Sequence, residues 1–162
     1  MFELYTQSAR RIIFLARDEA MRYGSACIES EHFLLGILRE NEAVASHIAG
    51  PTLSVADLRK EIEAITSIGR AITEPIEIPL SADCKRILTT AVQEAEALRP
   101  QLSTVEEVEA LRPKQVTIAH FLIVILRVET SAAARILQSH GATILRFREK
   151  AIKDIRWADA PD

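Results

Sequence analysis

The chain has 162 residues, of which 48% are hydrophobic and only 5% aromatic, and its formal net charge is −3. This length fits one compact domain, and an apolar content made mostly of Ala, Ile, Leu and Val favours packed helices over a β-sandwich. The acidic balance argues against nucleic acid or an anionic membrane surface as a partner, and no apolar run is long enough to span a membrane, so we expect a cytoplasmic protein.

The first helix is predicted over residues 9–20, where apolar residues recur at helical spacing. Thr6 precedes this stretch as an N-cap, and Gly24 follows it as a C-terminal stop. Ser30 is placed to cap a second helix, whose inward residues fall within 33–38. These two helices begin the predicted bundle.

Two more helices complete the first half. Asn41 is placed to cap a third helix that ends at Gly50. Ser54, followed three residues later by Asp57, has the pattern of a capping box, and an apolar stripe runs through residues 55–65. The stretch 1–68 is therefore predicted to form a four-helix unit.

A linker is predicted at residues 69–79, because Pro75 and Pro79 are incompatible with a helix there. Apolar and acidic residues alternate between these prolines, which favours packing of the segment into the seam between two halves of the molecule. Ser81 then caps a helix in the same way as Thr6 caps the first one.

The chain contains an internal repeat. When the stretch that begins at Thr6 is aligned with the stretch that begins at Ser81, Ile12 pairs with Ile87, and Glu19 pairs with Glu94. Further along, a larger offset pairs His32 with His120, Phe33 with Phe121, and Arg39 with Arg127. The sequence therefore predicts an all-α fold in which two four-helix units, about eight helices in total, form a pseudo-two-fold repeat.

The change of offset has its origin in a short tandem duplication. The sequence EALRP occurs at 96–100 and again at 109–113. We expect the resulting insertion, near residues 99–113, to protrude from the surface and to hold a short extra helix at 103–112. The predicted division is a first repeat at 1–68, the linker, a second repeat at 80–157 and a polar tail at 158–162.

Two motifs in the first half carry a resemblance to a known family. Residues 30–36 read SEHFLLG and residues 39–45 read RENEAVA. With the tandem units, these motifs make the chain similar to the Clp N-terminal (Clp R) repeat domain of Clp-type ATPases, and the similarity covers nearly all of residues 1–162. The phosphate-loop motif GxxxxGK[ST] of the ATPase modules does not occur.

The resemblance implies a module that recognises substrates or adaptor proteins for the Clp ATP-dependent unfoldase and protease system in protein quality control. Its expected partners are Clp ATPase and protease components, adaptor proteins, and unfolded or tagged substrates. The alternative is a freestanding accessory protein that docks on the Clp protease core and regulates it without binding substrate. We expect no enzymatic activity, cofactor or metal, because neither GxSxG nor HExxH nor a Cys/His cluster is present.

The resemblance also implies a ligand site for arginine phosphorylated on its guanidinium group, formed by Thr6, Ser30 and Glu31. A carboxylate suits the N–H donors of phosphoarginine, and a helix N-terminus suits its phosphate. The other interpretation of Glu31 is a solvated acid that the helix dipole favours at this position. The second half has Ala119 where the first has Glu31, so we expect one site rather than two.

Other polar residues favour structural roles. His32 and His120 are expected to be hydrogen-bonded residues in or near the core rather than metal ligands. The charged stretches at 59–61 and 146–153 are expected to form solvated helix faces. Cys84 falls on an apolar helix face, and two cysteines are too few for a disulfide framework, so reduced thiols are expected.

Overall fold

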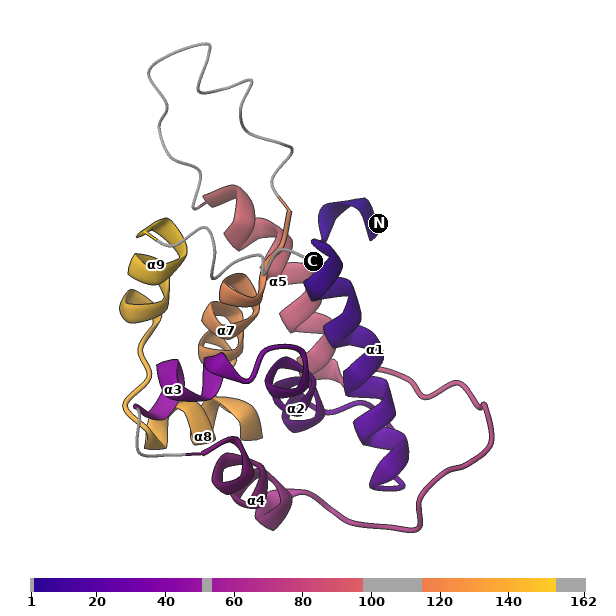
Figure 1. Cartoon of the computed structure of the whole chain (residues 1–162). Helices are drawn as coiled ribbons and strands as arrows, with labels where there is room; N and C mark the ends of the chain where they lie inside the picture. The colour runs from indigo at the N-terminus through magenta and orange to yellow at the C-terminus, as the bar shows by residue number, and fades with distance from the viewer. Residues whose placement is uncertain (1, 51–53, 98–114, 154–162) are drawn as a thin grey trace.

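The computed structural model of the chain describes residues 2–50, 54–97 and 115–153. This part of the chain contains eight α-helices and one short 3-10 helix, and no strand longer than an isolated bridge (Figure 1). The predicted all-α fold is confirmed. The extra helix expected at 103–112, the whole insertion near 99–113 and the tail at 158–162 lie outside the described residues, so the predicted division of the chain stays a prediction.

The helices follow the order expected from the repeat. The first half contains η1 (Phe2–Leu4), α1 (Gln7–Arg22), α2 (Ser30–Glu40), α3 (Ala43–Ala49) and α4 (Val55–Ile65). The second half contains α5 (Ala82–Ala97), α7 (Ile118–Arg127), α8 (Ala132–Ser139) and α9 (Ile144–Lys153).

Local capping chemistry explains where several helices begin. The Thr6 hydroxyl accepts a hydrogen bond from the Ala9 backbone N–H at 3.2 Å, and the Ser54 hydroxyl accepts one from Asp57 N–H at 3.1 Å. The Ser81 hydroxyl accepts one from Cys84 N–H at 3.2 Å, as the repeat predicts. These bonds satisfy backbone donors that have no partner within the helix.

Two predicted caps are wrong by one residue. The N-cap of α2 is Glu29 rather than Ser30, because the His32 side chain accepts from Glu29 N–H and completes a capping box with it. The N-cap of α3 is Glu42 rather than Asn41, although the Asn41 side chain still accepts from Ala43 N–H at 3.1 Å. Ser30 is therefore the first residue of α2 and does not cap this helix.

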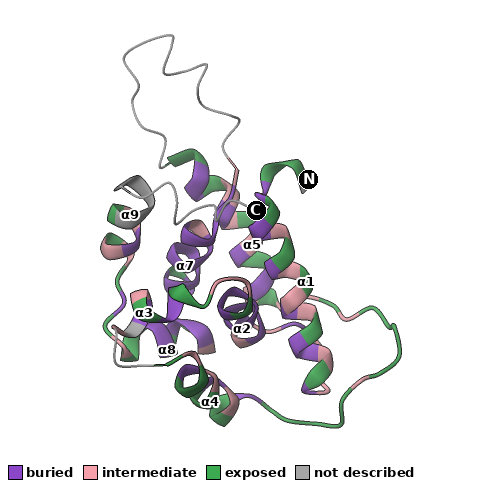
Figure 2. Ribbon diagram, viewed as in Figure 1, coloured by how far each residue is buried: buried purple, intermediate pink, exposed green. Residues whose placement is uncertain are grey.

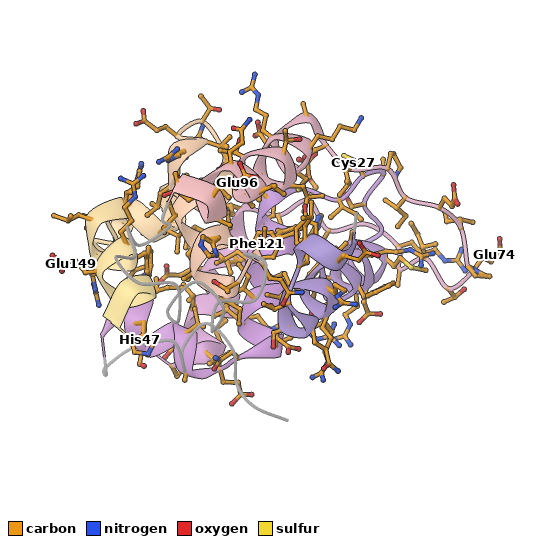
Figure 3. The ribbon with its side chains drawn as sticks, turned by 90° about the horizontal axis from the view of Figure 1, so that it is seen from above. Cys27, His47, Glu74, Glu96, Phe121 and Glu149 are labelled. Carbon is orange, nitrogen blue, oxygen red and sulfur yellow. The ribbon has the colours of Figure 1, made fainter. Side chains whose placement is uncertain are left out.

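The core is built around α2 and α7, which are buried along nearly their whole length (Figure 2). Phe33 and Phe121, which the repeat pairs, meet edge to face with ring centroids 5.0 Å apart. Tyr5 stacks on Phe121 at 6.1 Å, and Figure 3 shows Phe121 in the middle of the molecule. The matched residues of the two halves therefore meet each other in a single core.

The two halves exchange backbone contacts in a symmetric way. Tyr5 pairs with Val116, and Ile28 pairs with Leu80, each as an isolated parallel bridge. Thr6 N–H donates to Val116 C=O at 3.0 Å, and at the matched position Ser81 N–H donates to Ile28 C=O, also at 3.0 Å. The start of α1 therefore lies beside the start of α7, and the start of α5 lies beside the start of α2.

The linker between α4 and α5 contains no helix, as its prolines predict, and it sweeps away from the bundle as a wide loop with Glu74 near its outer tip (Figures 1 and 3). Its first part is tied to the end of α1, where Gly69 N–H donates to Tyr23 C=O at 2.7 Å. Ile78 packs against the core, but Ile76 is 45% exposed. The predicted packing of this segment against the bundle therefore holds for Ile78 only.

A buried glutamate in each half binds two arginines. Glu19 of α1 is 0% exposed, and its carboxylate lies 3.2 Å from Arg39 of α2 and 3.0 Å from Arg59 of α4. In the second half, the carboxylate of Glu94 meets Arg127 of α7 at 2.6 Å and Arg148 of α9 at 2.8 Å. We call each group an arginine clamp, because one carboxylate joins three helices.

The clamps correct two predictions about charged residues. Arg59 and Arg148 come from the stretches 59–61 and 146–153, which were expected to form solvated faces. The side chain of Arg59 is only 26% exposed and that of Arg148 is 36% exposed, because each reaches inward to a buried carboxylate. A fully buried carboxylate requires such partners, since desolvation without them would be costly.

Candidate functional site

Ser30 and Glu31 lie at the first turn of α2, where backbone N–H groups of the helix have no partner within it. Ser30 is 2% exposed, and its hydroxyl accepts a hydrogen bond from Ala133 N–H of α8 at 3.2 Å. The same hydroxyl donates to the Glu31 carboxylate at 3.3 Å. Ser30 therefore joins the two halves and orients Glu31, rather than facing an open site.

Glu31 is half-buried and lies close to the start of α5. Burial raises the pKa of its carboxyl group, and the nearby negative charges of Glu29 and Asp83 raise it further. The backbone bond between Ser81 N–H and Ile28 C=O brings the two helix starts together. We call the set of Ser30, Glu31, Ser81 and Asp83 the α2–α5 corner.

Thr6 is not part of this corner. It is 5% exposed, and its hydroxyl caps α1 while its backbone N–H binds Val116 before α7. The residue that the structure places beside the start of α2 is Ser81, which is the repeat counterpart of Thr6. The structure therefore brings Ser30 and Glu31 together and leaves Thr6 at the other junction between the halves.

Ser81 and Asp83 were not predicted from the sequence as members of the corner. The repeat already pairs Thr6 with Ser81, so the signal was present in the alignment of the two halves. What the sequence does not contain is the pairing of backbone between halves, which puts the start of the first helix of one unit beside the start of the second helix of the other. That arrangement depends on tertiary packing.

The matched junction near Thr6 has a different chemistry. Ile118 and Ala119 replace Ser30 and Glu31 at the start of α7, and both are buried apolar residues. No carboxylate stands at this point of α7, so the junction has nothing there to hold the N–H donors of a guanidinium group. The expectation of a single site stays a prediction that this asymmetry supports.

The two histidines at the helix starts have structural roles. His32 Nδ1 accepts from Glu29 N–H, and His120 Nδ1 accepts from Thr117 N–H, both at 3.0 Å. His32 is 1% exposed, and burial lowers its pKa, so its ring is neutral near pH 7. Among the described residues, no group of three or more His, Cys, Asp or Glu side chains has the arrangement of a metal site.

Both cysteines lie next to the corner and are free. Cys84 is buried, and burial raises the pKa of its thiol to about 12. Cys27 donates its S–H to the Glu29 carboxylate at 2.9 Å, and this bond raises the pKa of the Cys27 thiol to about 11. Neither thiol is a thiolate at neutral pH, so neither is an activated nucleophile.

In the described part of the chain, none of the helices combines the length and the apolar character that crossing a bilayer requires. Nitrogen- and oxygen-bearing side chains extend outward around the described part of the chain (Figure 3). The candidate binding surfaces are the α2–α5 corner and the outer faces of the helices.

A family model and the sequences of known proteins both relate this chain to Clp proteins. The model of the Clp repeat (R) N-terminal domain matches residues 4–108. The chloroplast chaperone protein ClpC2 of Oryza sativa subsp. japonica is 31% identical over 96% of this chain, and the ATP-dependent Clp protease ATP-binding subunit ClpA homolog of Cyanidium caldarium is 30% identical over 96% of it. The chain spans only 16% and 17% of the lengths of these two relatives.

Solved structures show the same fold. The N-terminal domain of the caseinolytic protease associated chaperone ClpD from Arabidopsis thaliana superimposes with a TM-score of 0.67 at 20% identity, covering 96% of this chain and 97% of that one. A chain from preliminary structural investigations of a malarial protein secretion system gives a TM-score of 0.72 at 15% identity, covering 98% of this chain and 99% of that one. With the match of the family model, these results show that the chain belongs to the family of Clp repeat (R) N-terminal domains.

Proposed function

We propose that this chain recognises substrates or adaptor proteins for the Clp ATP-dependent unfoldase and protease system. The observation that carries the proposal is the family match over residues 4–108, together with relatives that are named as Clp chaperones and ATP-binding subunits. The Clp repeat domain is non-catalytic, so the role that fits it is binding. We further propose that this chain has no enzymatic activity of its own.

The α2–α5 corner supports a recognition role physically. The starts of α2 and α5 lie side by side there, and a helix N-terminus in general favours an anion. The carboxylates of Glu31 and Asp83 offer acceptors for a cationic or N–H-rich group at the same place. A ligand with both kinds of group would be matched by this corner better than one with either alone.

A retention experiment tests the recognition role. The immobilised chain is mixed with a purified Clp ATPase, the Clp peptidase and an unfolded client protein, and we expect the ATPase or the client to be retained. Glu31→Ala should reduce retention of the client, whereas Glu129→Ala, which removes an exposed carboxylate elsewhere, should not. Retention of none of the components would contradict the proposal.

The same experiment distinguishes substrate or adaptor recognition from the alternative of an accessory protein that binds no substrate. Retention of the peptidase without any client would favour an accessory protein that docks on the protease core. The cytoplasmic location expected from the sequence stays a prediction, and several relatives that match the chain are named as chloroplast proteins.

A narrower proposal is that the corner binds phosphoarginine, with Ser81 in the place that sequence analysis gave to Thr6. Glu31 would accept from the guanidinium N–H groups, and the N–H groups at the helix starts would face the phosphate. Glu29 and Asp83 add negative charge there and oppose a phosphate. The helix N-termini must therefore outweigh two carboxylates for this ligand to bind.

Calorimetric titration with free phosphoarginine tests this ligand. We expect Glu31→Ala to weaken binding at least about tenfold, since a half-buried charged contact is lost. Ser81→Ala should also weaken it, while Thr6→Ala should not. The last two variants are matched, because each removes a helix N-cap and costs about 1 kcal/mol of stability. Absence of binding to the wild-type chain, or equal affinity of wild type and Glu31→Ala, would contradict the proposal.

A further inference from the structure

The outer face of α1 carries an exposed aromatic side chain between two arginines. Phe14 is 63% exposed, which is a large fraction for an apolar ring. Arg10 precedes it by one helical turn and Arg17 follows it by about one turn, so all three side chains lie on the same face. The helix runs along one side of the bundle (Figure 1), and the exposure of Phe14 shows that this face is turned to solvent.

Exposed apolar side chains also stand at both ends of this face. Leu4 is 41% exposed, and the carbonyl of its neighbour Tyr5 accepts a hydrogen bond from Arg10. Ile76 is 45% exposed, and its carbonyl accepts a hydrogen bond from Arg17. Leu4 from η1 and Ile76 from the linker therefore add exposed apolar surface to the basic and aromatic residues of α1. We call this surface the α1 stripe, and its members are Leu4, Arg10, Phe14, Arg17 and Ile76.

Both arginines of the stripe are held in place without being neutralised. Arg10 Nε donates to Tyr5 C=O at 3.1 Å, and Arg17 Nη2 donates to Ile76 C=O at 2.8 Å. Within residues 2–50, 54–97 and 115–153, no carboxylate forms an ion pair with either guanidinium group. A carbonyl fixes the geometry of a guanidinium group but leaves its positive charge for another partner.

Other charges of α1 are already paired. Arg11 forms an ion pair with Glu40 at 3.5 Å, and Asp18 forms one with Arg39 at 2.5 Å. Glu77 lies near one end of the stripe, because it lines a shallow open hollow together with Arg17, Ile78 and Pro79. Glu77 therefore lies near Arg17 on the linker side, and the positive charge of Arg10, and of Arg17 on the side facing Phe14, has no carboxylate of the described residues paired with it.

We propose that the α1 stripe binds an acidic amphipathic segment of a partner protein. Carboxylates of that segment would pair with Arg10 and Arg17, and an apolar side chain would cover Phe14. Arginine and aromatic side chains are the residue types that contribute most binding energy at protein interfaces, especially where they are held in advance. The complementary charge of the two arginines is the reason for an acidic occupant.

The stripe is separate from the α2–α5 corner, and it extends the recognition role by naming the chemistry of a docking partner. An exposed ring flanked by arginines also suits single-stranded nucleic acid. The exposed apolar side chains of Leu4 and Ile76 favour an amphipathic protein segment instead. Nucleic acid is therefore an outcome that the test must be able to detect.

Fluorescence anisotropy with synthetic probes tests the proposal on the full chain. The probe is a labelled helical peptide in which Glu and Leu recur at helical spacing, and two further peptides carry Lys or Gln in place of every Glu. We expect the Glu peptide to bind and the Lys peptide not to. The double variant Arg10→Glu/Arg17→Glu and the variant Phe14→Ser should each weaken binding at least about tenfold.

Arg135→Glu is the matched control. Arg135 lies on α8, is exposed, and donates to the carbonyl of Thr130 at 3.4 Å, so it is also an arginine held by a carbonyl. It should leave the affinity for the Glu peptide unchanged. Amide chemical shifts of the wild-type chain should change along α1 when the peptide is added. Circular dichroism of each variant shows whether it keeps the fold.

Three results would overturn the proposal. One is equal binding of the Glu and Lys peptides, and another is an equal effect of Arg135→Glu and the double variant. The third is tighter binding of a thymidine oligonucleotide through Arg10, Phe14 and Arg17. Because the probes are synthetic peptides, none of these results depends on whether Clp components bind the chain, and the failure of either proposal leaves the other standing.

Discussion

Replacing Glu19 by alanine is expected to lower the free energy of unfolding by about 3 kcal/mol. The carboxylate is 0% exposed and binds Arg39 and Arg59, so its removal leaves two guanidinium groups facing a space without an anion. The expected loss lies at the lower end for a broken buried pair, because the arginine side chains are 29% and 26% exposed and water compensates part of it. Urea unfolding followed by circular dichroism measures the effect.

The second half provides the matched experiment. Glu94→Ala should cost a similar free energy, since Glu94 is 1% exposed and binds Arg127 and Arg148. Glu61→Ala removes an exposed carboxylate that pairs with His140 and should cost less than about 1 kcal/mol. If Glu19→Ala and Glu61→Ala had the same small effect, the arginine clamp would not stabilise the fold.

Replacing Gly36 by valine is expected to cost more than about 3 kcal/mol or to prevent folding. A Cβ atom at this position would lie 2.9 Å from Ile12 O and 3.0 Å from Ala16 N, which are backbone atoms of α1 and cannot move without shifting the helix. In an open helix, Gly→Ala would instead stabilise by about 1 kcal/mol. Thermal unfolding of Gly36→Ala and Gly36→Val should therefore show a graded loss.

The counterpart of Gly36 in the second half is Val124, which is 0% exposed. Val124→Ala should cost only an ordinary loss of buried methyl groups, about 1–2 kcal/mol. The comparison isolates the close approach of α1 and α2 from the general cost of altering a core helix. A Gly36→Ala variant at least as stable as the wild type would show that α1 can move away, and would contradict the expected clash.

The helix order could be predicted from the sequence because its signals are local. The hydroxyls of Thr6, Ser54 and Ser81 each bind a backbone N–H three residues ahead, so the cap and the start of its helix lie in one short stretch. The N-cap of α2 was misplaced by one residue for a related reason. Ser30 is a better N-cap than Glu29 by residue type, but its hydroxyl is used by Ala133 from α8, far away in the sequence.

The composition of the α2–α5 corner could be predicted only in part. Ser30 and Glu31 are neighbours in sequence, so they were found together, but Ser81 comes from the other half. The arginine clamp could not be predicted for the same reason. Glu19 and Arg59 are far apart along the chain, and no local pattern indicates that Arg59 points inward. The pairing of Glu19 with Glu94 in the repeat was the available sign that this position has a structural role.

The exchanged backbone pairs have a consequence for how the chain reaches its native state. Tyr5 pairs with Val116 and Leu80 pairs with Ile28, so a backbone pair joins the two units at each of their two junctions. This is the geometry of a two-fold homodimer whose subunits have been fused into one polypeptide. Each pair joins residues that are far apart in the chain, so a long loop must close before the pair can form, and this closure has an entropic cost.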